Sequence, residues 1–260
     1  MALEKILDVS TELFSLQDIR HSFRGLHVLK GVNFSVAQGD FIGLIGPNGA
    51  GKSTLFNIAS GFLAPDHGSV NFDGAPIMNC SVQERSRRGL VRTFQTPKVF
   101  GGMTVLENLM VGWHKKSHSG IVGNLFRSRR SLREFSQAKS AADAVLERFN
   151  LKHVAQTQAA NLPAGLQRML ELARAHIGQP RLLMLDEPSS GLNDDEIAQL
   201  KRVLNELNRE GVSILLVSHD MDLVDAATTI HVLCFGEIIA AGSMAQVRQD
   251  ARVREAYLGT

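Results

Sequence analysis

Residues 46 to 53 read Gly-Pro-Asn-Gly-Ala-Gly-Lys-Ser, a complete G-x-x-x-x-G-K-[ST] phosphate-binding loop. The apolar run 41–45 precedes the loop and a helix-like stretch, 54–59, follows it. In this strand–loop–helix order the glycines let backbone N–H groups turn toward phosphate oxygens, with a helix N-terminus behind them. The alternative, a glycine-rich turn that only caps a buried helix, is disfavoured by the flanking strand and helix. The sequence therefore predicts a nucleoside triphosphate site.

The residues of this loop have separate predicted roles. Lys52 can reach the β- and γ-phosphates, and the hydroxyl of Ser53 can hold Mg²⁺. The predicted nucleotide contacts in this segment are Gly46, Pro47, Asn48, Gly49, Ala50, Gly51, Lys52, Ser53 and Thr54.

The composition sets limits on size and partners. With 260 residues, 44% of them hydrophobic, the chain can bury a full core as one large domain or two lobes. A net charge of +2 indicates no particular acidic partner. The basic residues concentrate in 114–133, where a solvated surface is favoured over contact with lipid head groups or a partner. Aromatic residues are too sparse there for a nucleic-acid stacking surface.

The two cysteines, Cys80 and Cys234, are far apart and lie in apolar surroundings. This predicts reduced core residues rather than a disulfide framework or a metal cluster. The N-terminus lacks the basic-then-apolar pattern of a secretory signal. No stretch approaches the roughly 18 apolar residues of a membrane span. We expect a soluble, cytoplasmic protein that reaches any membrane it serves through a partner.

Short apolar runs alternate with amphipathic stretches, as in a mainly parallel sheet flanked by helices. The predicted strands are 16–23, 31–36, 41–45, 68–73, 90–94, 181–186, 212–218, 229–235 and 237–241. Close spacing of the early strands, with Gly39-Asp40 and Asp73-Gly74 as turn signals, predicts a separate small antiparallel sheet. No strand pattern occurs between about 96 and 178. We expect a helical block inserted between strands of the core.

Helix starts and stops are marked by local signals. Predicted capping boxes are Ser81 with Glu84, Thr104 with Glu107, Ser131 with Glu134, and Asn193 with Glu196. Predicted C-terminal stops are Gly61, Gly89, Gly178 and Gly211.

Two carboxylates follow a buried-strand pattern. Residues 182–185 form an uninterrupted apolar run, as in a buried parallel strand, so charges at its C-terminal end are expected to face a ligand crevice. Asp186 suits a Mg²⁺ contact through water, and Glu187 suits the general base that orients an attacking water. Such a pair also caps surface turns, but together with a phosphate loop it indicates a catalytic site.

Two more polar residues follow predicted strands. His219 can donate a hydrogen bond to a γ-phosphate and hold the water and carboxylate in place, although a lone histidine is more often structural. Gln95 ends the strand 90–94 and opens the helical block, so its side chain can contact Mg²⁺ or water while its backbone moves with that block. The predicted catalytic residues are Lys52, Glu187 and His219, and the predicted metal ligands are Ser53, Gln95 and Asp186.

Together these residues resemble the ATP-binding cassette (ABC) ATPases. The phosphate loop, Gln95, Asp186-Glu187, the segment 190–193 and His219 occur in that family's order and spacing, and the resemblance covers residues 12 to 260. It places Phe23 at the aromatic position that stacks on adenine, against the alternative of an ordinary core phenylalanine. It implies ATP and Mg²⁺ as ligands, and an ATPase reaction coupled to solute transport across a membrane.

The resemblance also implies an α/β fold, with a P-loop NTPase (RecA-like) core, a small antiparallel β subdomain and an inserted α-helical subdomain. Within one ABC ATPase domain at 12–260, we expect the core with its β subdomain at 12–95 and 179–241. The helical subdomain is expected at 96–178 and a C-terminal helix at 242–260.

Within the family, the chain resembles the LivG-type ATPase subunit of branched-chain (hydrophobic) amino-acid importers. The supporting stretches are 92–95, 103–108, the basic segment through Arg133, and 256–259, although the lipopolysaccharide-export ATPase ends similarly. This implies a peripheral subunit on the cytoplasmic side of the inner membrane. Implied partners are a second ABC ATPase subunit (a related heterodimer partner or a second copy), transmembrane permease subunits and, indirectly, a periplasmic or extracellular solute-binding protein. No nucleic acid is implied.

The family's signature segment usually reads Leu-Ser-Gly-Gly-Gln, and this chain departs from it. The matching residues, called here the signature segment, are Leu162, Pro163, Ala164, Gly165, Leu166 and Gln167. Pro163 replaces a serine that would bond a γ-phosphate, but proline fits the first turn of the predicted helix 165–177. A phosphate can still be held, with fewer side-chain hydrogen bonds. Because two subunits of this family pack head to tail, the departure affects the partner's site.

Other functions are disfavoured to different degrees. The insertion at 114–133 argues against a lipopolysaccharide-type exporter. Non-transport ABC proteins usually have two cassettes or a long coiled coil, and the sequence shows neither. A P-loop kinase or GTPase leaves the signature-like segment without a purpose, and intact Glu187 and His219 argue against a subunit that only binds ATP. The cargo stays open between branched-chain amino acids, urea and short amides.

Overall fold

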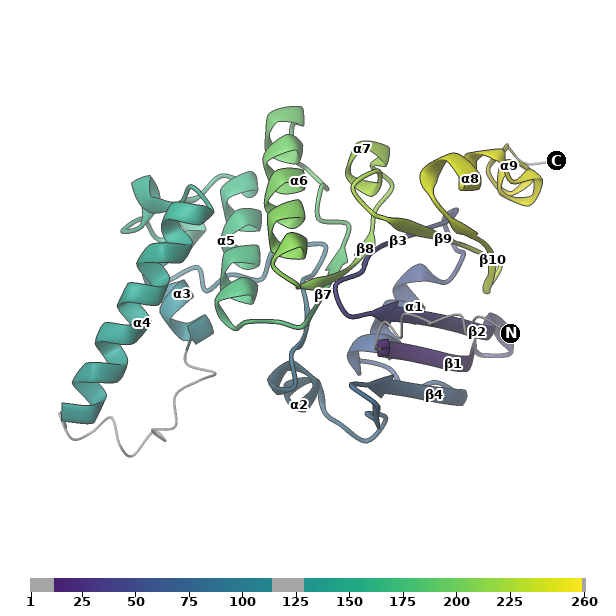
Figure 1. Cartoon of the computed structure of the whole chain (residues 1–260), viewed down its shortest axis with the longest axis horizontal. Coiled ribbons are helices and arrows are strands. Elements are labelled where there is room, and N and C mark those ends of the chain that lie inside the picture. The colour runs from purple at the N-terminus through teal and green to yellow at the C-terminus, as the bar shows by residue number, and fades with distance from the viewer. Residues whose placement is uncertain (1–11, 114–128, 259–260) are drawn as a thin grey trace, which may run out of the picture.

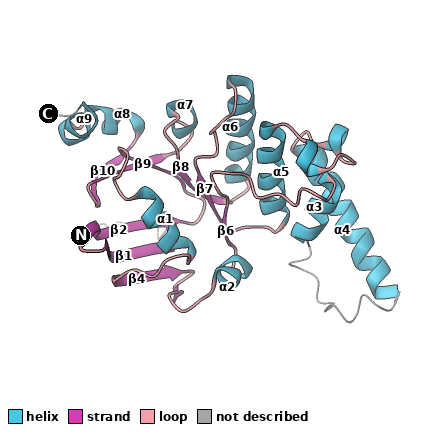
Figure 2. Cartoon of the chain, turned by 180° about the vertical axis from the view of Figure 1, so that it is seen from behind, coloured by secondary structure: helices cyan, strands magenta, loops and turns pink. Residues whose placement is uncertain are grey.

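The computed structural model describes residues 12–113 and 129–258, which build two sheets and their flanking helices (Figures 1 and 2). The strands are β1 (Glu12–Phe23), β2 (Leu26–Ala37), β3 (Phe41–Ile45), β4 (His67–Phe72), β5 (Ala75–Pro76), β6 (Leu90–Arg92), β7 (Leu182–Asp186), β8 (Ser213–Val217), β9 (Thr229–Cys234) and β10 (Glu237–Gly242). The helices are α1 (Lys52–Ser60), α2 (Val82–Arg87), α3 (Val105–Trp113), α4 (Arg129–Arg148), α5 (Ala164–Ile177), α6 (Asp194–Arg209), α7 (Met221–Val224), α8 (Met244–Gln249) and α9 (Ala251–Leu258).

The larger sheet carries the phosphate loop. Its strand order is β10-β9-β3-β8-β7-β6; β10 runs antiparallel to β9, and the other neighbours are parallel. All residues of β3 and β8 are buried, as expected for strands covered on both faces. The predicted α/β architecture with a mainly parallel sheet is confirmed.

The smaller sheet is antiparallel, with the order β2-β1-β4-β5, as the close strand spacing predicts. Asp73-Gly74 forms the turn between β4 and β5. Gly39-Asp40 also lies at a turn, as predicted, but its assignment to the small sheet is wrong, because this turn leads from β2 into β3 of the larger sheet. The Asp40 carboxylate accepts a hydrogen bond of 2.7 Å from the backbone of Ala37, which tightens the turn.

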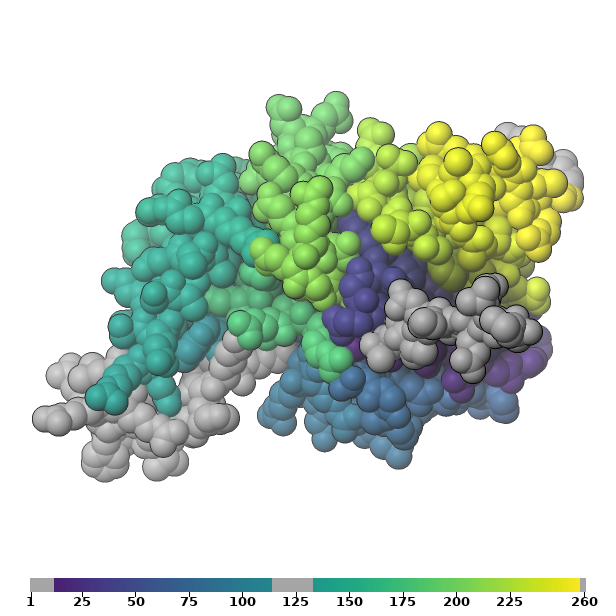
Figure 3. All heavy atoms as spheres, in the orientation of Figure 1, coloured from purple at the N-terminus to yellow at the C-terminus, as the bar shows by residue number. Residues whose placement is uncertain are grey.

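Helices α3, α4 and α5 lie at one end of the molecule, away from the smaller sheet (Figure 1). In the described parts of 96–178 no strand occurs, and Thr104 and Gln158 form an isolated bridge. One apolar cluster runs from Leu109 and Phe149 in this block to Leu183 in the larger sheet. Figure 3 shows α6 on the surface between this helical end and the C-terminal helices. The division into subdomains at 95/96 and 178/179 stays a prediction.

Three of the predicted capping boxes are seen among the described side chains. They are Ser81–Glu84, Thr104–Glu107 and Asn193–Glu196, in each of which side chain and backbone bond reciprocally. The box Ser131–Glu134 is wrong as a helix start, because α4 already begins at Arg129. Gly61 ends α1 with φ of 86°, as expected of a left-handed stop, whereas Gly178 ends α5 with φ of −72°.

Two predicted element boundaries differ from the structure. β6 ends at Arg92, so Gln95 lies in the loop beyond the strand rather than at its end. The C-terminal segment forms two helices, α8 and α9, rather than one helix over 242–260. They separate at Asp250, which has an extended ψ of 124° and whose carboxylate accepts a hydrogen bond of 2.8 Å from the backbone of Arg252.

The remaining predictions concern cysteines and surfaces. Cys80 and Cys234 are both free; Cys234 is buried, but Cys80 is half-buried at the margin of the core. Most of the basic segment, residues 114–128, lies outside the described residues. Within 12–113 and 129–258, no helix is long and apolar enough to cross a bilayer.

Candidate nucleotide-binding site

The phosphate loop passes from the end of β3 into the start of α1. At Gly46 the φ angle is +156°, and a Cβ would lie 2.0 Å from the carbonyl oxygen of Leu233. A Cβ on Gly51, where φ is +105°, would lie 2.9 Å from the Leu29 side chain. A Cβ on Gly49 would have no atom within 4 Å, but the φ angle of +80° at this residue still favours glycine. The glycines of the motif therefore let the loop pack closely against neighbouring segments and adopt the positive φ angles that its turns require.

Lys52, the first residue of α1, folds back over this loop. Its Nζ donates hydrogen bonds of 2.6 and 3.0 Å to the carbonyl oxygens of Gly46 and Pro47. Burial lowers the pKa of the Lys52 ammonium, and the carboxylates of Glu187 and Asp186 oppose that shift. The cation thus lies between the loop and the two acidic residues, where a phosphate oxygen could replace a carbonyl partner.

An open pocket of about 510 Å³ brings most of the predicted residues together. The predicted residues that line it are Phe23, Asn48, Gly49, Ala50, Gly51, Lys52, Ser53, Thr54, Gln95, Asp186 and Glu187. The residues missing from its lining are Gly46, Pro47, His219 and the whole signature segment, 162–167.

Apolar side chains form one wall of the pocket. Phe23 is 48% exposed at the end of β1, which excludes the ordinary core alternative for this residue. Leu26, Val28 and Val217 line the pocket with it, and sequence analysis missed all three. Such residues carry no motif, since only the hairpin from β1 to β2 brings Leu26 and Val28 beside the loop. The wall provides an apolar surface for a planar base.

Glu187 and His219 form a pair at the pocket rim. The Nδ1 atom of His219 lies 2.7 Å from Glu187 Oε2, and the His219 backbone N–H donates to the same oxygen at 3.3 Å. The His219 side chain is 79% exposed and that of Glu187 18%. Glu187 adopts a φ of 47°, a strained conformation that often occurs at functional sites. His219 therefore reaches the pocket through Glu187 rather than by lining it.

Asp186 has a partner that sequence analysis missed. Arg92, at the end of β6, places its Nη2 2.6 Å from Asp186 Oδ2. Both side chains are largely buried, at 8% and 13% exposed. A charged residue in the otherwise apolar stretch 90–94 is the signal that could have found it, because a neighbouring strand ends in a carboxylate.

The backbone around Gln95 is held by α5. Arg168, only 1% exposed, donates through Nη1 to the Phe94 carbonyl oxygen at 2.5 Å and through Nη2 to that of Gln95. Its Nη1 also bonds Glu171 Oε2 at 2.7 Å, and Glu171 in turn accepts from the Lys98 backbone N–H at 3.0 Å. We call Arg168 and Glu171 the α5 clamp. The clamp ties the loop that carries Gln95 to the helix that follows the signature segment.

The signature segment is arranged differently from its prediction. Pro163 is the residue before α5 rather than part of its first turn, and its carbonyl oxygen accepts from the Gln167 backbone at 3.0 Å. The Gln167 side chain donates to the carbonyl oxygens of Ala159 and Leu162, which closes the turn from inside. A Cβ on Gly165 would lie 1.9 Å from Glu196 Oε1, so Gly165 contacts the start of α6 in its own chain.

Comparison with known proteins identifies the family. Residues 29–190 match the model of the family described as ABC transporter. Residues 237–260 match that of the branched-chain amino acid ATP-binding cassette transporter. The chain is 39% identical to the high-affinity branched-chain amino acid transport ATP-binding protein LivG of Escherichia coli (strain K12), covering 96% of this chain and 99% of that protein. The chain belongs to the ABC transporter ATP-binding family.

Other relatives and solved structures agree with this membership. The ABC cassette is 38% identical to the ATP-binding protein BraF of Pseudomonas aeruginosa, over 96% of this chain and 99% of that protein. A nucleotide-free ATP-binding cassette from an ABC transporter superposes with a TM-score of 0.81 at 32% identity, covering 96% and 100% of the two chains. The ADP conformation of such a cassette gives the same TM-score at 33% identity and the same coverage. The P-loop NTPase fold is thereby confirmed.

The predicted magnesium ligands lie together at the nucleotide pocket. Among the described residues, no three His, Cys, Asp or Glu side chains gather as a metal site. The predicted ligands Ser53, Gln95 and Asp186 line one pocket, and they offer oxygen atoms but few charges. Mg²⁺ commonly binds in this way, through one carboxylate, water and substrate phosphates. One Asp186 oxygen is engaged by Arg92, which leaves the other for such a contact.

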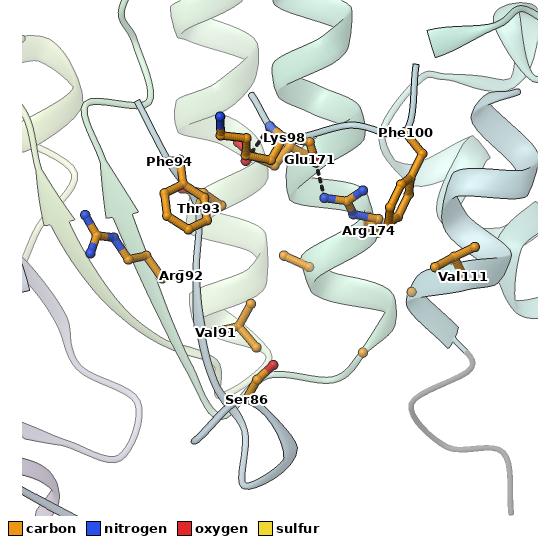
Figure 4. Close-up of a pocket in the computed structure, with 13 residues that line it drawn as sticks. Ser86, Val91, Arg92, Thr93, Phe94, Lys98, Phe100, Val111, Glu171 and Arg174 are labelled. Carbon is orange, nitrogen blue, oxygen red and sulfur yellow. Dashed lines mark hydrogen bonds between the residues drawn. The ribbon is translucent and has the colours of Figure 1, made fainter. Parts of the chain in front are cut away.

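A second depression lies where α5 meets the loop that carries Gln95 (Figure 4). This groove of about 270 Å³, called here the loop groove, is bounded by β6, the loop 93–100, α3 and α5. Phe100 and Val111 stand exposed at its edge, and the Arg174 guanidinium lies 4.8 Å from the centre of the Phe100 ring. Arg174 also donates to the Lys98 carbonyl oxygen. The groove therefore touches the same loop that the nucleotide pocket touches.

Proposed function

We propose that this cassette binds and hydrolyses ATP to power a bacterial ABC importer for branched-chain amino acids or a related small polar solute such as urea or an amide. The observation that carries the proposal is the match over 96% of the chain to branched-chain amino acid transport ATP-binding proteins. The C-terminal match at 237–260 favours this subgroup over the lipopolysaccharide-type exporter. The pocket supplies the chemistry.

The nucleotide is held by the phosphate loop and the apolar wall. Residues 46–54 bind the phosphates through backbone N–H groups and Lys52, and Phe23 stacks on the adenine ring. Support comes from the pocket, in which Phe23, Lys52 and the loop line a single space. The cation of Lys52 and the exposed ring of Phe23 therefore bind opposite ends of one ligand.

Hydrolysis depends on the carboxylates at the end of β7. Ser53, Gln95 and Asp186 hold Mg²⁺, which supplies positive charge against the phosphates when bound. Glu187 accepts a proton from the attacking water, and His219 orients the Glu187 carboxylate. The 2.7 Å contact between His219 and Glu187 supports this division of roles.

A second ATPase subunit completes the site. The signature segment, 162–167, lines no part of this chain's own pocket, although Pro163 and Ala164 are exposed. In a head-to-tail pair it contacts the nucleotide on the partner's phosphate loop through backbone groups at the start of α5. The partner is a related ATPase subunit or a second copy of this chain.

Permease subunits dock at the loop groove, on the cytoplasmic side of the inner membrane. The groove borders the loop of Gln95, so a docked segment can respond to the nucleotide pocket. The solute-binding protein acts indirectly through the permease, and no nucleic acid takes part.

Affinity purification of the full-length chain from its native membrane tests the proposal. We expect permease subunits and a second ATPase subunit to co-purify, and vesicles containing the complex to take up labelled leucine when ATP is supplied inside. The Lys52→Ala variant serves as the control: it should co-purify the same subunits but support no uptake. Recovery of the chain without any membrane subunit would contradict the importer assignment, and uptake of urea but not leucine would correct the cargo.

A further inference from the structure

The guanidinium of Arg92 lies behind the nucleotide pocket and joins three elements. Its Nη2 bonds Asp186 Oδ2 at 2.6 Å. Its Nη1 donates to Asn57 Oδ1 at 2.7 Å and to Ser60 Oγ at 2.9 Å. Asn57 and Ser60 belong to α1, the helix that begins with Lys52 and Ser53. A single side chain of β6 therefore fixes the carboxylate at the end of β7 to the helix behind the phosphate loop.

The surroundings make this position costly for any other side chain. Three aromatic rings, those of Phe56, Phe62 and Phe94, have centres 5.3 to 5.6 Å from the Arg92 Cζ atom. Such rings favour a cation over a neutral group. The planar guanidinium can serve three acceptors in fixed directions, which a lysine ammonium cannot match.

Arg92 acts on the pocket indirectly, through Asp186 and α1. Asp186 lines the nucleotide pocket, whereas Arg92 does not. Since Oδ2 is held by Arg92, the carboxylate can offer Oδ1 to the pocket in one orientation. The positive charge of Arg92 also offsets part of the negative charge that Asp186 presents to phosphates and cations.

We propose that Arg92 is a positioning residue for the magnesium site, holding one oxygen of Asp186 and setting the net charge that the site presents. This rests on the proposed function, which assigns Asp186 to magnesium. The arrangement keeps the empty site weakly attractive to divalent cations and tolerant of nucleotide phosphates. Binding of Mg²⁺ at Asp186 would then depend on the presence of the nucleotide.

Removal of the Arg92 charge should raise the affinity of the site for Mg²⁺ and lower its affinity for the nucleotide without Mg²⁺. In Arg92→Met the Asp186 carboxylate loses its counter-charge, so its attraction for Mg²⁺ rises and its repulsion of phosphate rises as well. We expect the MgCl₂ concentration that half-maximally promotes ADP binding to fall about three- to tenfold. In EDTA, the affinity for ADP should fall by a similar factor. Isothermal titration calorimetry of the full chain with ADP, which is not consumed, measures both.

Two further variants separate charge from geometry and from general damage. Arg92→Lys keeps the positive charge, so both binding constants should stay within about twofold of the wild type. Its hydrolysis rate should nevertheless fall, because the ammonium cannot hold Asp186, Asn57 and Ser60 together.

The matched control is Arg85→Met. Arg85 is another buried arginine against α1, but it donates to the carbonyl oxygens of Ile58 and Ala59 and pairs with no carboxylate of the described residues.

A folding defect alone would weaken ADP binding in both conditions, as expected for Arg85→Met if α1 is perturbed. Opposite shifts in Arg92→Met, absent in Arg85→Met, support the positioning role. An unchanged or higher MgCl₂ requirement in Arg92→Met overturns it. If Arg92→Met does not fold, loss of the wild-type MgCl₂ dependence in Arg92→Lys would equally contradict the charge argument. Failure of the wild-type chain to bind ADP at all would instead contradict the proposed function.

Discussion

Two side-chain pairs in this cassette, each containing a glutamate, have contrasting surroundings. Glu187 and His219 meet at the pocket rim, where His219 is 79% exposed. Arg168 and Glu171 of the α5 clamp meet inside the protein, at 1% and 4% exposed. The first pair is open to solvent on its histidine side. The second pair bonds backbone atoms of Phe94, Gln95 and Lys98 as well as each other.

The different surroundings of the two pairs indicate different functions, catalysis for the rim pair and stability for the α5 clamp. An exposed pair contributes little to stability, but its atoms remain free to meet water and a phosphate. A buried pair is costly to break, because a lone charge would remain without solvent. We infer that substitutions at the rim change turnover at nearly constant stability, whereas those in the clamp change stability first. The predictions below test this separation.

The largest effect on stability is expected from breaking the α5 clamp. Arg168→Met leaves Glu171 buried without its counter-charge and the Phe94 and Gln95 carbonyl oxygens without a donor. We expect the free energy of unfolding to fall by about 3–5 kcal/mol. Urea denaturation followed by circular dichroism measures it.

The control for this prediction is a pair that solvent can reach. Arg20→Met breaks the 2.9 Å pair with Asp18, whose two side chains are 57% and 43% exposed, and should cost about 0–1 kcal/mol. The double variant Arg168→Met with Glu171→Met should cost less than the sum of the two single changes, because neither charge is then left alone. Additive costs would show that the two side chains do not act as a unit.

A pH-dependent effect of intermediate size on the free energy of unfolding is expected from His176, near the C-terminal end of α5. Burial lowers the pKa of His176 to about 4, and the neighbouring Arg148 cation adds to the shift while Glu210 opposes it. The Nε2 atom of neutral His176 lies 3.5 Å from Arg148 Nη1 and can accept a hydrogen bond from it.

The sign of this effect follows from the lowered pKa. The unfolded chain takes up the proton near the ordinary pKa of about 6.5, before the folded chain does. The stability that neutral His176 contributes is therefore complete above about pH 6.5 and is lost as the pH falls toward 4, by about 1–3 kcal/mol. Urea titrations at several pH values measure this loss. His176→Gln does not titrate and should show a correspondingly smaller loss; an identical loss would exclude His176 as its source.

The smallest effect is expected at Gly165. A Cβ there would meet Glu196 Oε1 at 1.9 Å, so Gly165→Ala displaces the carboxylate that caps α6. We expect the lost cap, which costs about 1 kcal/mol, to outweigh the better helix propensity of alanine at this first turn, so that Gly165→Ala is slightly destabilising. In a Glu196→Ala background the same substitution should become stabilising by about 0.5–1 kcal/mol. Thermal unfolding of the wild type, the two single variants and the double variant measures both effects of Gly165→Ala, and an effect of the same sign in both backgrounds would contradict the contact.

The sequence predicts motif-bearing parts of this cassette well and supporting parts poorly. The phosphate loop, Asp186 and Glu187 could be found because each combines a strand pattern with a distinctive end. The loop after Arg92 could not be placed accurately, since β6 ends where Arg168 takes the backbone carbonyl groups that a longer strand would use. That partner lies far along the chain, and no local pattern encodes the contact.

Contacts that the local sequence does not encode also explain the other differences between prediction and structure. Gly39-Asp40 has the composition of a hairpin turn, but pairing of β3 with β8 and β9 redirects the chain into the larger sheet. The separation of α8 from α9 depends on the conformation of one residue, Asp250. Arg92 was overlooked because a single charge in an apolar strand gains meaning only when its neighbour, Asp186, is known.

The most direct test of this account is a comparison of turnover and binding in Glu187→Gln. Glutamine keeps the size of the side chain but cannot accept a proton from water, so we expect steady-state ATP hydrolysis to fall by about 10²–10⁴-fold. ATP affinity and the free energy of unfolding should stay near the wild-type values, as the exposed position of the His219 partner implies. Unchanged hydrolysis in Glu187→Gln, or a loss of stability as large as in Arg168→Met, would contradict the separation of the chemical pair from the supporting pair.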